Sequence, residues 1–530
     1  MAWRSAPGRR GAVAGDARAE EVSPSALAKA PDPSIVPVKP ANADAEPVEG
    51  RGGAEGNASP PHTGRAQDRA PVLSGLERIR QAARERKEER FTTLLTHVDT
   101  DLLRFAYRAL KRDAAPGVDG MTWREYAEGL EERLADLKDR VHSGRYRAHP
   151  SRRHLIPKPD GRMRPLGIAA LEDKIVQRAL VEVLNAIYEE DFLGFSYGFR
   201  PGRGQHDALD ALAVAIGECR VNWILDADIR AFFDSIDHMW MMRFLEHRIG
   251  DARVLRLIRK WLTVGVVDET GKRQPATAGS PQGAVASPLL ANVYLHYVYD
   301  LWVRQWRQRH ATGTMAVVRY ADDTVVGFEH RSDAERFLAD LRERLARFAL
   351  ELNADKTRLI EFGRQAAADR ARRGAGKPET FDFLGFTHIC GRSRRGGFLL
   401  KRQTRRQRKQ AKLKEIKEEL RRRRHQGIPE QGRWLGQVMS GFYAYFAVPT
   451  NYRALANLRY HVGVLWMRAL RRRSQKDKTP WEKLTRLADH WLPRPRIIHP
   501  WPGNRFRVKH PRWEPDALIG HVRFCAGGAR

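Results

Sequence analysis

The sequence predicts a fold of mixed α-helices and β-strands, on the strength of three observations. Short runs rich in β-branched and apolar residues, such as HLIPK and WILDADI, have the length and composition of strands. The segment EDKIVQRALVEVLNAIYEEDF repeats its apolar residues at the 3.6-residue period of a helix. Segments of the two kinds alternate along the chain, which favours helices packed against sheets. Because 530 residues exceed what one hydrophobic core usually serves, about two to four domains are expected.

The charge balance indicates a polyanionic partner. The chain has 95 Lys and Arg against 64 Asp and Glu, a formal net charge of +31 and a pI near 10.5. Such an excess makes nucleic acid the leading candidate. No membrane partner is expected, because no stretch of about 18 uncharged apolar residues occurs. Three widely spaced cysteines offer neither a disulfide framework nor a zinc motif, and no signal-type segment is found, so a cytoplasmic protein is expected.

Residues 1–75 are predicted to form a disordered tail. They hold ten of the 29 prolines and nine glycines, with Trp3 as the only aromatic residue. A segment of this composition cannot bury enough apolar surface to offset the entropy lost on ordering. A helical period first appears beyond Leu76, and folding is expected to begin there.

An adjacent pair of acids stands inside the apolar stretch VVRYADDTVVGF. The stretch is typical of a β-hairpin whose tight turn brings Asp322 and Asp323 to the edge of a sheet. Two carboxylates about 4 Å apart repel each other by about 4 kcal/mol at an effective dielectric constant of 20. A divalent cation would remove that conflict, although an isolated acid pair in a turn is more often simply solvated.

A second acid cluster lies in WILDADIRAFFDSIDH. Alternation along the strand puts Asp226 and Asp228 on one face, so Asp228 emerges at the end of a strand. Together with the turn acids it offers the oxygen ligands that Mg²⁺ prefers, which fits phosphoryl transfer. We interpret Asp226 as a solvated or ion-paired acid and Asp234 as a possible helix cap. The histidines His206 and His238 are interpreted as structural.

Two further segments add to this picture. In HLIPKPDGRMRPLGI, a predicted tight hairpin turn is flanked by Lys158 and Arg164, a basic tip suited to a triphosphate. In TAGSPQGAVASPLLANVYLHYVYD, glycines hold the backbone close to a neighbour, and Asn292 and Tyr294 are expected to open a helix. Each segment alone would be an ordinary charged hairpin or a loop before a core helix.

In this order, the motifs resemble the polymerase blocks of bacterial group II intron reverse transcriptases and maturases. The blocks are AAPGVDGMT, HLIPKPDGRMRPLGI, FSYGFRPGRGQHDAL, DADIRAFFDSIDH, GSPQGAVASPLLANVYLH, VVRYADDTVV, ELNADKTRLIEFG and FDFLGFTH. The segment from WLGQVMSGFYAYF to IIHPWP resembles the maturase region of the same family. The resemblance covers about four-fifths of the chain and leaves out the N-terminal tail.

The resemblance implies a right-hand polymerase of α+β class, with fingers, a palm carrying an antiparallel sheet and a helical thumb, followed by an α-helical maturase domain. It gives the following boundaries: a tail at 1–75, fingers at 76–215, palm at 216–395, a basic helical thumb start at 396–430, a thumb and maturase domain at 431–500 and a basic C-terminal tail without an endonuclease domain at 501–530. The expected partners are group II intron RNA, an RNA template with a DNA primer, dNTPs and target DNA.

The resemblance also assigns roles to individual residues. It makes Asp228, Asp322 and Asp323 the catalytic acids that hold two Mg²⁺ ions, which Mn²⁺ could replace, with the backbone carbonyl of Ile229 as a further ligand. It assigns nucleotide binding to Lys158, Arg164, Phe233, Gln282 and Lys356. Phe233 would press on the sugar and reject a 2′-hydroxyl, whereas its alternative interpretation is a core aromatic.

Basic residues late in the chain are expected to bind RNA. The run from Lys401 to Arg424 has 13 basic and three acidic residues and coincides with the family's thumb. A second group of basic residues, Arg471 to Arg473, lies within the maturase-like region. The RNA-binding residues are expected to be Arg405, Arg406, Arg408, Arg471, Arg472 and Arg473.

Two alternative functions remain open from the sequence. One is a reverse transcriptase used outside an intron, in a retron or a phage-defence system, against which the segment past Gly432 argues. The other is an RNA-binding splicing factor without polymerase activity, against which the intact acids argue.

Overall fold

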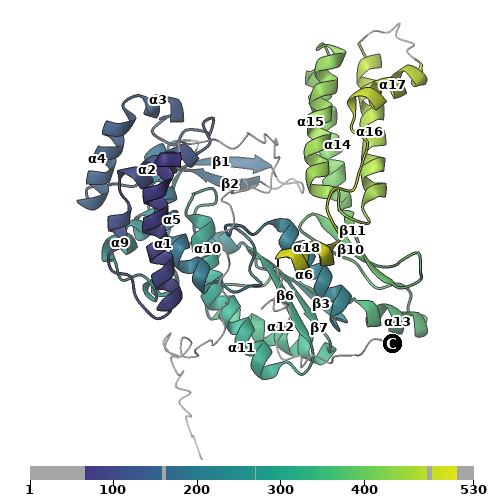
Figure 1. Ribbon diagram of the computed structural model, residues 1–530, viewed down its shortest axis with the longest axis horizontal. Helices are drawn as coiled ribbons and strands as arrows, with labels where there is room; N and C mark the ends of the chain where they lie inside the picture. Colours follow the sequence, from purple (N-terminus) through teal and green to yellow (C-terminus); the bar gives the residue numbers. More distant parts are fainter. Residues whose placement is uncertain (1–65, 158–162, 269, 474–479, 510–530) are drawn as a thin grey trace, which may run out of the picture. The chain divides into compact units, whose positions relative to one another are not determined.

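Four antiparallel strands in the order β6-β7-β3-β8 form the central sheet of the chain (Figure 1). The computed structural model describes residues 66–157, 163–268, 270–473 and 480–509. The strands of the central sheet are β3 (Trp223–Asp228), β6 (Met315–Tyr320), β7 (Asp323–Phe328) and β8 (Arg358–Glu361). Their order brings segments together that are far apart in the sequence, because β3 pairs with β7 on one side and with β8 on the other.

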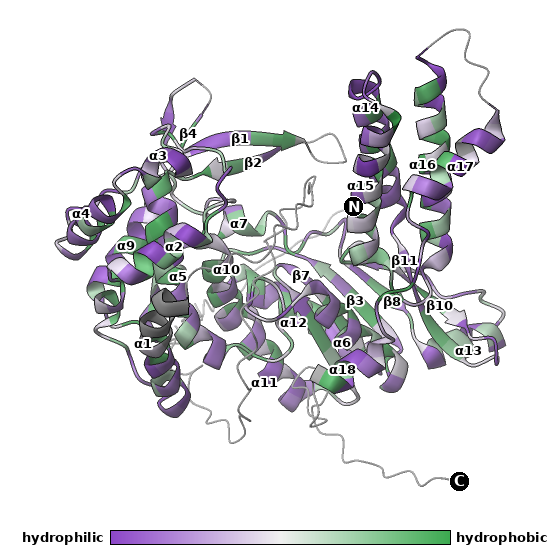
Figure 2. Cartoon of the chain, turned by 45° about the horizontal axis from the view of Figure 1, so that its top comes forward, coloured by the Kyte–Doolittle hydropathy of each residue, from purple (hydrophilic) through white to green (hydrophobic). Residues whose placement is uncertain are grey.

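Strands β6 and β7 of the central sheet are buried on both faces, which explains their continuous apolar runs. Val317, Val318, Val325 and Val326 are each at most 1% exposed, and Figure 2 shows strands β3 and β7 as hydrophobic. Helix α12 (Arg331–Ala346) contacts β3 and β7, and helix α6 (Gln205–Glu218) contacts β6. The hairpin predicted for VVRYADDTVVGF is therefore confirmed, with β6 and β7 as its arms.

Helices surround this sheet and make up most of the chain before it. Helix α5 (Leu171–Asp191), which the apolar period predicts, is buried along most of its length and contacts α1 and α2. The remaining helices before residue 350 are α1 (Ala66–Glu85), η2 (Leu94–His97), α2 (Thr100–Ala109), α3 (Trp123–Ala127), α4 (Leu130–His142), α7 (Phe232–Ser235), α8 (His238–Glu246), α9 (Ala252–Thr263), α10 (Ser287–Leu295), the π-helical η3 (His296–Asp300) and α11 (Leu301–His310).

The predicted boundary of the N-terminal tail is wrong by about ten residues. Helix α1 begins at Ala66, not beyond residue 75. Its apolar side chains Leu76, Ile79 and Ala83 are buried and anchor the helix. Once such a nucleus is fixed, a helix extends at low cost toward its N-terminus, so it runs into sequence with no apolar period of its own. Residues 1–65 of the predicted tail lie outside the described residues.

A second sheet contains the basic hairpin predicted from HLIPK. Strand β1 (Ser151–Pro157) pairs antiparallel with β2 (Met163–Ile168), from Arg152 opposite Ile168 to Pro157 opposite Met163. The sheet is completed by the short strands β4 (Val266–Val267) and β5 (Arg273–Gln274). The two arms of the hairpin are thus confirmed, and its tip at 158–162 lies outside the described residues.

A third sheet corrects the prediction of a wholly helical segment at 396–430. Strand β11 (Phe398–Thr404) pairs with β10 (Phe386–Arg392), which pairs with β9 (Phe381–Phe383). The many basic residues of this run concealed the inward and outward alternation of side chains that is typical of a strand. Arg402 is one of the inward side chains and is 2% exposed. The helix predicted there begins only at Arg406, as α14 (Arg406–Arg422). Helix α13 (Arg364–Arg372) lies between the two sheets in the sequence.

The described chain after this sheet is helical, as the family resemblance implies. The helices are α15 (Ile428–Phe446), α16 (Tyr452–Arg471), α17 (Trp481–Trp491) and α18 (Pro502–Lys509). Helix α14 packs against α16, and α17 packs against both α15 and α16.

Within the segment predicted to be a basic C-terminal tail from residue 501, residues 502–509 form helix α18, which packs on α6. Arg505 of α18 bonds to the carboxylate of Asp210 on α6, and Arg402 of β11 approaches the same carboxylate to 3.0 Å. The buried Asp210, which lies much earlier in the sequence, thus anchors helix α18. The composition of the C-terminal segment alone could not reveal this contact. Residues 510–530 lie outside the described residues.

Among the helices of the described ranges, none combines the length and the apolar character that crossing a membrane requires.

Candidate active site

The two acid clusters meet at one edge of the central sheet. In the β3–β7 ladder Asp228 stands directly opposite Asp323, the first residue of β7. Asp322 precedes it in the turn from β6, so the three carboxyl-bearing residues belong to two adjacent strands and one turn. The side chains of all three are partly exposed. The backbone register thus places Asp228 beside the turn that contains Asp322 and Asp323.

The turn between β6 and β7 holds the acids in a constrained backbone. Tyr320 pairs with Asp323, which leaves Ala321 and Asp322 as the two turn residues. Ala321 has a φ of 55°, in the left-handed region, which costs a residue with a β-carbon about 1–2 kcal/mol. The residue is 5% exposed, so neighbouring groups hold it in this conformation.

Lys356 makes a direct ion pair with the acid of β3. Its Nζ lies 2.8 Å from Oδ2 of Asp228, and Nδ2 of Asn353 donates to the same oxygen at 3.3 Å. Both residues belong to the loop before β8, which is bound to β3 because Asn353 N donates to Asp228 O at 2.8 Å. The structure thus brings Lys356, predicted from NADKT, into contact with Asp228, the first of the three predicted acids.

The backbone of Ile229 lies beside the same ladder. Ile229 forms an isolated antiparallel bridge with Leu352. The hydrogen bonds on either side of this bridge use Asp228 O and Arg230 N, so the carbonyl of Ile229 stands outside that pairing. This position is compatible with the ligand role that the sequence resemblance implies.

Asp226 and Asp234 differ from the three acids in their surroundings. Burial raises the pKa of Asp226 to about 6, while Arg358, its partner in the β3–β8 ladder, acts to lower it. Asp226 is thus a half-buried acid beside an arginine, as its structural interpretation requires. The proposed cap role of Asp234 is wrong, because Asp234 lies inside α7 and the acid that caps α8 is Asp237, which accepts from Trp240 N at 2.8 Å.

The segment TAGSPQGA packs against the chain that follows β3. Ser280 N donates to Phe233 O at 2.8 Å, and Gly279 N donates to Ile236 O at 2.8 Å. His238 Nε2 lies 2.7 Å from Gly279 O, which confirms a structural role for this histidine. Phe233 itself is partly exposed and has an edge contact with Phe232, with ring centroids 5.5 Å apart.

The same segment also joins the basic hairpin. Gly167 N of β2 donates to Gln282 O at 2.6 Å, so the base of the hairpin lies against the loop that holds Gln282. Arg164 lies on β2 opposite Ile156 and is partly exposed, whereas Lys158 lies outside the described residues. Phe233, Gln282 and β2 are thus connected through backbone hydrogen bonds.

Helix α10 begins earlier than predicted. It starts at Ser287, with Pro288 in its first turn, so Asn292 and Tyr294 lie in its second half and do not open it. Proline is well suited to a first helical turn because that turn needs no amide donor. Asn292 is buried and donates from Nδ2 to Gly198 O at 2.7 Å.

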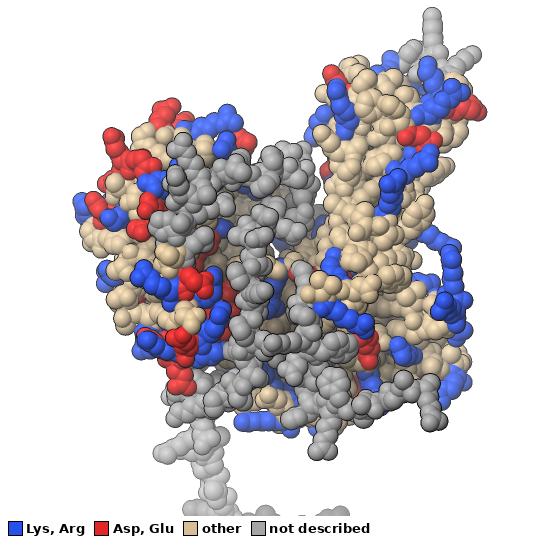
Figure 3. Space-filling view, in the orientation of Figure 1, with Lys and Arg blue, Asp and Glu red and all other residues tan. Residues whose placement is uncertain are grey.

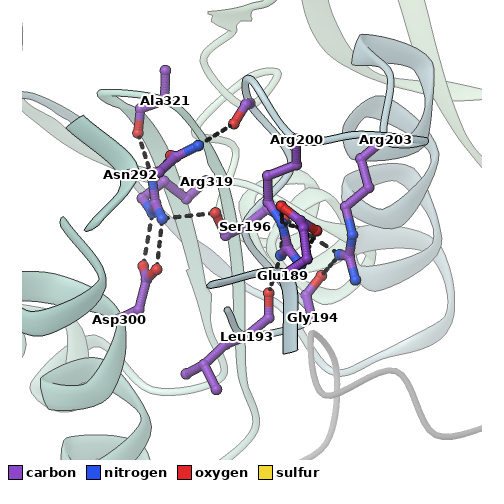
Figure 4. A network of polar contacts seen from close by, with 11 residues as sticks. Glu189, Leu193, Gly194, Ser196, Arg200, Arg203, Asn292, Asp300, Arg319 and Ala321 are labelled. Atoms are coloured by element: carbon purple, nitrogen blue, oxygen red, sulfur yellow. Dashed lines mark hydrogen bonds and ion pairs between the residues drawn. The ribbon is translucent and has the colours of Figure 1, made fainter. Parts of the chain in front are cut away.

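The residues that the sequence did not reveal lie beneath the β6–β7 turn. Figure 4 shows Arg319 of β6 and Asp300 at the end of η3 joined by a double contact inside the protein. Both side chains are 0% exposed. A signal was present in VVRYADD, where an arginine stands between apolar strand residues, but its partner is 19 residues away and could not be identified from a pattern.

The donor chemistry of the three acids suits a hard divalent cation, since carboxylate and carbonyl oxygens are the ligands that Mg²⁺ prefers. Within the described part of the chain, no three His, Cys, Asp or Glu side chains are gathered closely enough to form a metal site by themselves. Lys356 Nζ instead supplies the positive charge beside Asp228. These carboxylates would hold a divalent cation only together with further oxygen donors.

The predicted RNA-binding arginines lie on two helices. Arg406 and Arg408 are exposed on α14, and Arg405 forms an ion pair with Asp382 at 2.9 Å. Arg471 to Arg473 are exposed at the C-terminal end of α16, where Arg473 Nη2 donates to Gln426 O at 2.6 Å. Figure 3 shows Lys and Arg side chains on the visible face of these C-terminal helices.

A groove between α14 and α16 adds cations that the sequence did not single out. Its volume is about 510 Å³, and it contains both charge and an aromatic ring. Tyr460 is 61% exposed beside it. The groove is lined by Leu413, Lys414, Lys417, Tyr460, His461, Val464, Leu465 and Arg468. Exposed aromatic rings among cations are typical of nucleic-acid surfaces.

Comparison with known proteins gives a family match over the central part of the chain. The family model described as reverse transcriptase (RNA-dependent DNA polymerase) matches residues 156–388. This range includes strand β2, the β6–β7 hairpin, all three acids and Lys356.

Several curated proteins are similar to part of this chain. Protein YkfC from Escherichia coli strain K12 is 35% identical over 314 residues, which cover 53% of this chain and 77% of YkfC. Group II intron-encoded protein LtrA from Lactococcus lactis subsp. cremoris is 35% identical over 242 residues, 45% of this chain and 40% of LtrA. Nuclear intron maturase 3, mitochondrial, from Arabidopsis thaliana is 24% identical over 208 residues, 35% of this chain and 28% of that protein. The alignments thus span most of YkfC but less than half of LtrA and of the plant maturase.

Proposed function

The chain belongs to the group II intron type of reverse transcriptases, which are RNA-directed DNA polymerases, and we propose that it copies intron RNA into DNA at Asp228, Asp322 and Asp323 and assists the splicing of its host intron. The observation that carries this proposal is the β3–β7 register, in which Asp228 stands opposite Asp323. In polymerase terms the central sheet is the palm, the helices before it together with the β1–β2 hairpin are the fingers, and α14 to α17 form the thumb and maturase domain.

The three acids would hold two Mg²⁺ ions, for which Mn²⁺ could substitute, together with the carbonyl of Ile229. Bound there, the metal would activate the primer 3′-hydroxyl for attack on the α-phosphate of a dNTP and stabilise the leaving pyrophosphate. The carboxylates of Asp322 and Asp323 are held by the turn, and Asp228 is held by β3 and by its contact with Asn353. Fixed acids of this kind need little rearrangement when substrate binds.

The neighbouring residues would bind the incoming nucleotide. Arg164 and Lys158 on the β1–β2 hairpin would contact the triphosphate. Gln282 would line the base pocket and Phe233 would lie against the sugar, which is supported by the backbone bonds that connect the Gln282 loop with both Phe233 and β2. Lys356 would remain near the acids and balance their charge once the substrate phosphates arrive.

The C-terminal helices would bind RNA. The exposed arginines of α14 and α16 and the groove at Tyr460 offer charge for phosphates and an aromatic ring for a base. We propose that these helices bind the template and primer duplex and the folded intron RNA. Target DNA would be a further partner. The names of the intron-encoded relatives support this assignment.

The proposal is tested by primer extension with the purified full chain. With a primed RNA template, dNTPs and Mg²⁺, the wild type extends the primer, whereas Asp322→Ala loses extension and keeps its affinity for intron RNA. The matched control is Asp136→Ala, because Asp136 is an exposed acid on α4 with 63% side-chain exposure. Extension by Asp322→Ala at the wild-type rate would disprove the assignment of the acids.

A further inference from the structure

A buried arginine lies directly beneath the turn that contains the paired acids. Arg319 and its counter-ion Asp300 are both 0% exposed. Arg319 Nε donates to Asp300 Oδ1 at 2.7 Å, and Nη2 donates to Asp300 Oδ2 at 2.5 Å, which makes a bidentate pair. Pairs of this planar geometry fix the orientation of the guanidinium as well as its position.

The remaining donors of the guanidinium reach three other segments (Figure 4). Nη1 donates to the carbonyl of Ala321 at 2.9 Å and to Oδ1 of Asn292 at 3.1 Å. Nη2 donates to Oγ of Ser196 at 2.7 Å. These bonds, with the two to Asp300, engage all five N–H groups of an arginine. An ammonium group has three donors at one point and could not reproduce this set.

One of these acceptors determines the path of the turn. Ala321 immediately precedes Asp322, and its left-handed φ of 55° is unfavourable for alanine. A hydrogen bond from Arg319 to the Ala321 carbonyl fixes the peptide plane that leads into Asp322. The side chain of Arg319 therefore acts on the backbone of the turn.

A second segment supports the turn from its other side. Asn292 donates from Nδ2 to Gly198 O at 2.7 Å while it accepts from Arg319. A β-carbon on Gly198 would lie 2.2 Å from Ala321 N, so the two backbones are in close contact. Arg319 N and O also bond to Phe195 O and Tyr197 N, each at 2.9 Å.

The loop before Gly198 is itself fixed by arginines. Arg200 Nη1 donates to Leu193 O at 2.8 Å and to Ser196 O at 2.9 Å, and its guanidinium pairs with Glu189 of α5. Arg203 Nη1 donates to Gly194 O at 2.6 Å. The support under the turn thus continues into α5, so a displacement of the turn would disturb several buried bonds.

We propose that Arg319, oriented by Asp300 and linked to Gly198 through Asn292, is a positioning residue that fixes the turn carrying Asp322 and Asp323 for catalysis. The inference rests on the proposed function, because it takes these acids as the catalytic group. It adds a determinant of the catalytic rate that lies outside the acids and the nucleotide-binding residues.

The test compares Arg319→Lys with Arg248→Lys in the full chain. Arg248 is also buried and donates to several carbonyls near the end of α1, so this control matches the loss of a buried guanidinium away from the turn. Single-nucleotide incorporation on a primed RNA is measured over a range of dNTP and Mg²⁺ concentrations. For Arg319→Lys, kcat falls about 100-fold, KM for dNTP stays within about threefold and half-saturation by Mg²⁺ moves to higher concentration. Arg248→Lys retains the wild-type kcat and Mg²⁺ midpoint.

Two further measurements keep the test decisive. Hydrogen exchange of the peptide 317–328, measured without metal, is faster in Arg319→Lys than in Arg248→Lys. If Arg319→Lys does not fold, Asn292→Ala replaces it, because this variant keeps the ion pair and removes only the link to Gly198, and a smaller fall in kcat is expected. Wild-type kcat and unchanged exchange in the variants would overturn the positioning role while the wild type still extends primers. A wild type that does not extend primers would instead overturn the proposed function.

Discussion

Lys356, in the loop between α12 and β8, forms an ion pair with Asp228 at the end of β3, with 2.8 Å between Nζ and Oδ2. The Lys356 side chain is 56% exposed and that of Asp228 is 22% exposed, so the pair lies at the surface of the site. A cation bound by the acids has to share Asp228 with this ammonium group. If the acids bind metal as proposed, the pair would make the metal affinity depend on Lys356, which is not itself a ligand.

We expect Lys356→Met to bind Mg²⁺ more tightly. Removal of a partly exposed ion pair worth about 1 kcal/mol lowers the half-saturating Mg²⁺ concentration about fivefold. The midpoint is read from thermal stabilisation of the protein by Mg²⁺ in the absence of RNA. Lys272→Met, at an exposed loop position, serves as the control. An equal or higher midpoint in Lys356→Met would contradict competition at Asp228.

Gly198→Ala is expected to abolish primer extension. The added β-carbon would meet backbone atoms of Tyr320 and Ala321 at 2.9 and 2.2 Å, and neither can yield without moving the turn. We expect kcat to fall at least 100-fold. Gly217→Ala is the matched control, because its β-carbon would have no neighbour within 4 Å on helix α6. That variant keeps full activity and gains up to about 1 kcal/mol of stability. Normal extension by Gly198→Ala would show that the turn tolerates a shift.

Replacement of Arg471 to Arg473 by alanine is expected to weaken intron RNA binding. Three exposed cations at the end of α16 are lost. If each contacts a phosphate, the slope of log K against log salt becomes shallower by about 2 to 3. The affinity is measured by filter binding between about 50 and 200 mM salt.

The control for this charge change is the triple variant Arg309→Ala, Arg342→Ala and Arg347→Ala. These arginines are exposed on or next to α11 and α12. Equal slopes for the two triple variants would mean that only net charge matters and that α16 is not an RNA contact.

His388→Phe is expected to make stability less sensitive to acid. Burial is the main cause that lowers the pKa of His388 to about 3, and the nearby positive charge of Arg402 adds to it. Below the ordinary pKa of 6.5, His388 binds a proton in the unfolded chain but stays neutral in the folded chain. Stability therefore falls as the pH falls from 6.5 toward 3. At pH 5 the wild type has lost about 2 kcal/mol of unfolding free energy through His388, and His388→Phe avoids this loss. Phe can keep the stacking on Phe381, whose ring centroid is 4.7 Å from that of His388.

The measurement is the drop in thermal midpoint between pH 7.5 and pH 5. The wild type should show a larger drop than His388→Phe, and His154→Phe, at an exposed position on β1, should behave as the wild type. A drop of the same size in His388→Phe would contradict the burial of a neutral imidazole.

Local patterns predicted the parts of the site that are close in sequence. The strand that ends at Asp228 and the hairpin around Asp322 follow from alternation and from turn chemistry, which act over a few residues. Ligand chemistry and the family resemblance predicted that these two segments share a site, whereas their pairing as strands β3 and β7 was not predicted. Lys356 was also predicted, but not its direct contact with Asp228.

Tertiary relationships could not be predicted in the same way. The partner of Arg319 is Asp300 at the end of a π-helix, and no periodicity links the two. Strand β11 was hidden because its residues are basic, and the charge is tolerated since Arg402 meets Asp210 inside the protein. Helix α18 was missed for a related reason, because its anchor is the same distant acid.

The attachment of α18 to α6 has a consequence for biosynthesis. Asp210 and Arg505 are 295 residues apart, and Asp210 is 1% exposed once both arginines are in place. At about 5–20 residues per second, a ribosome adds Arg505 roughly 15 to 60 s after Asp210. During that interval the residues of the central sheet are completed at Glu361, while α6 still lacks the cover that α18 provides. Translation therefore delays the closure of this surface until Arg505 has been made, and a pause or a chaperone acting between these two points would meet a nascent protein whose sheet residues are complete but whose α6 face is still open.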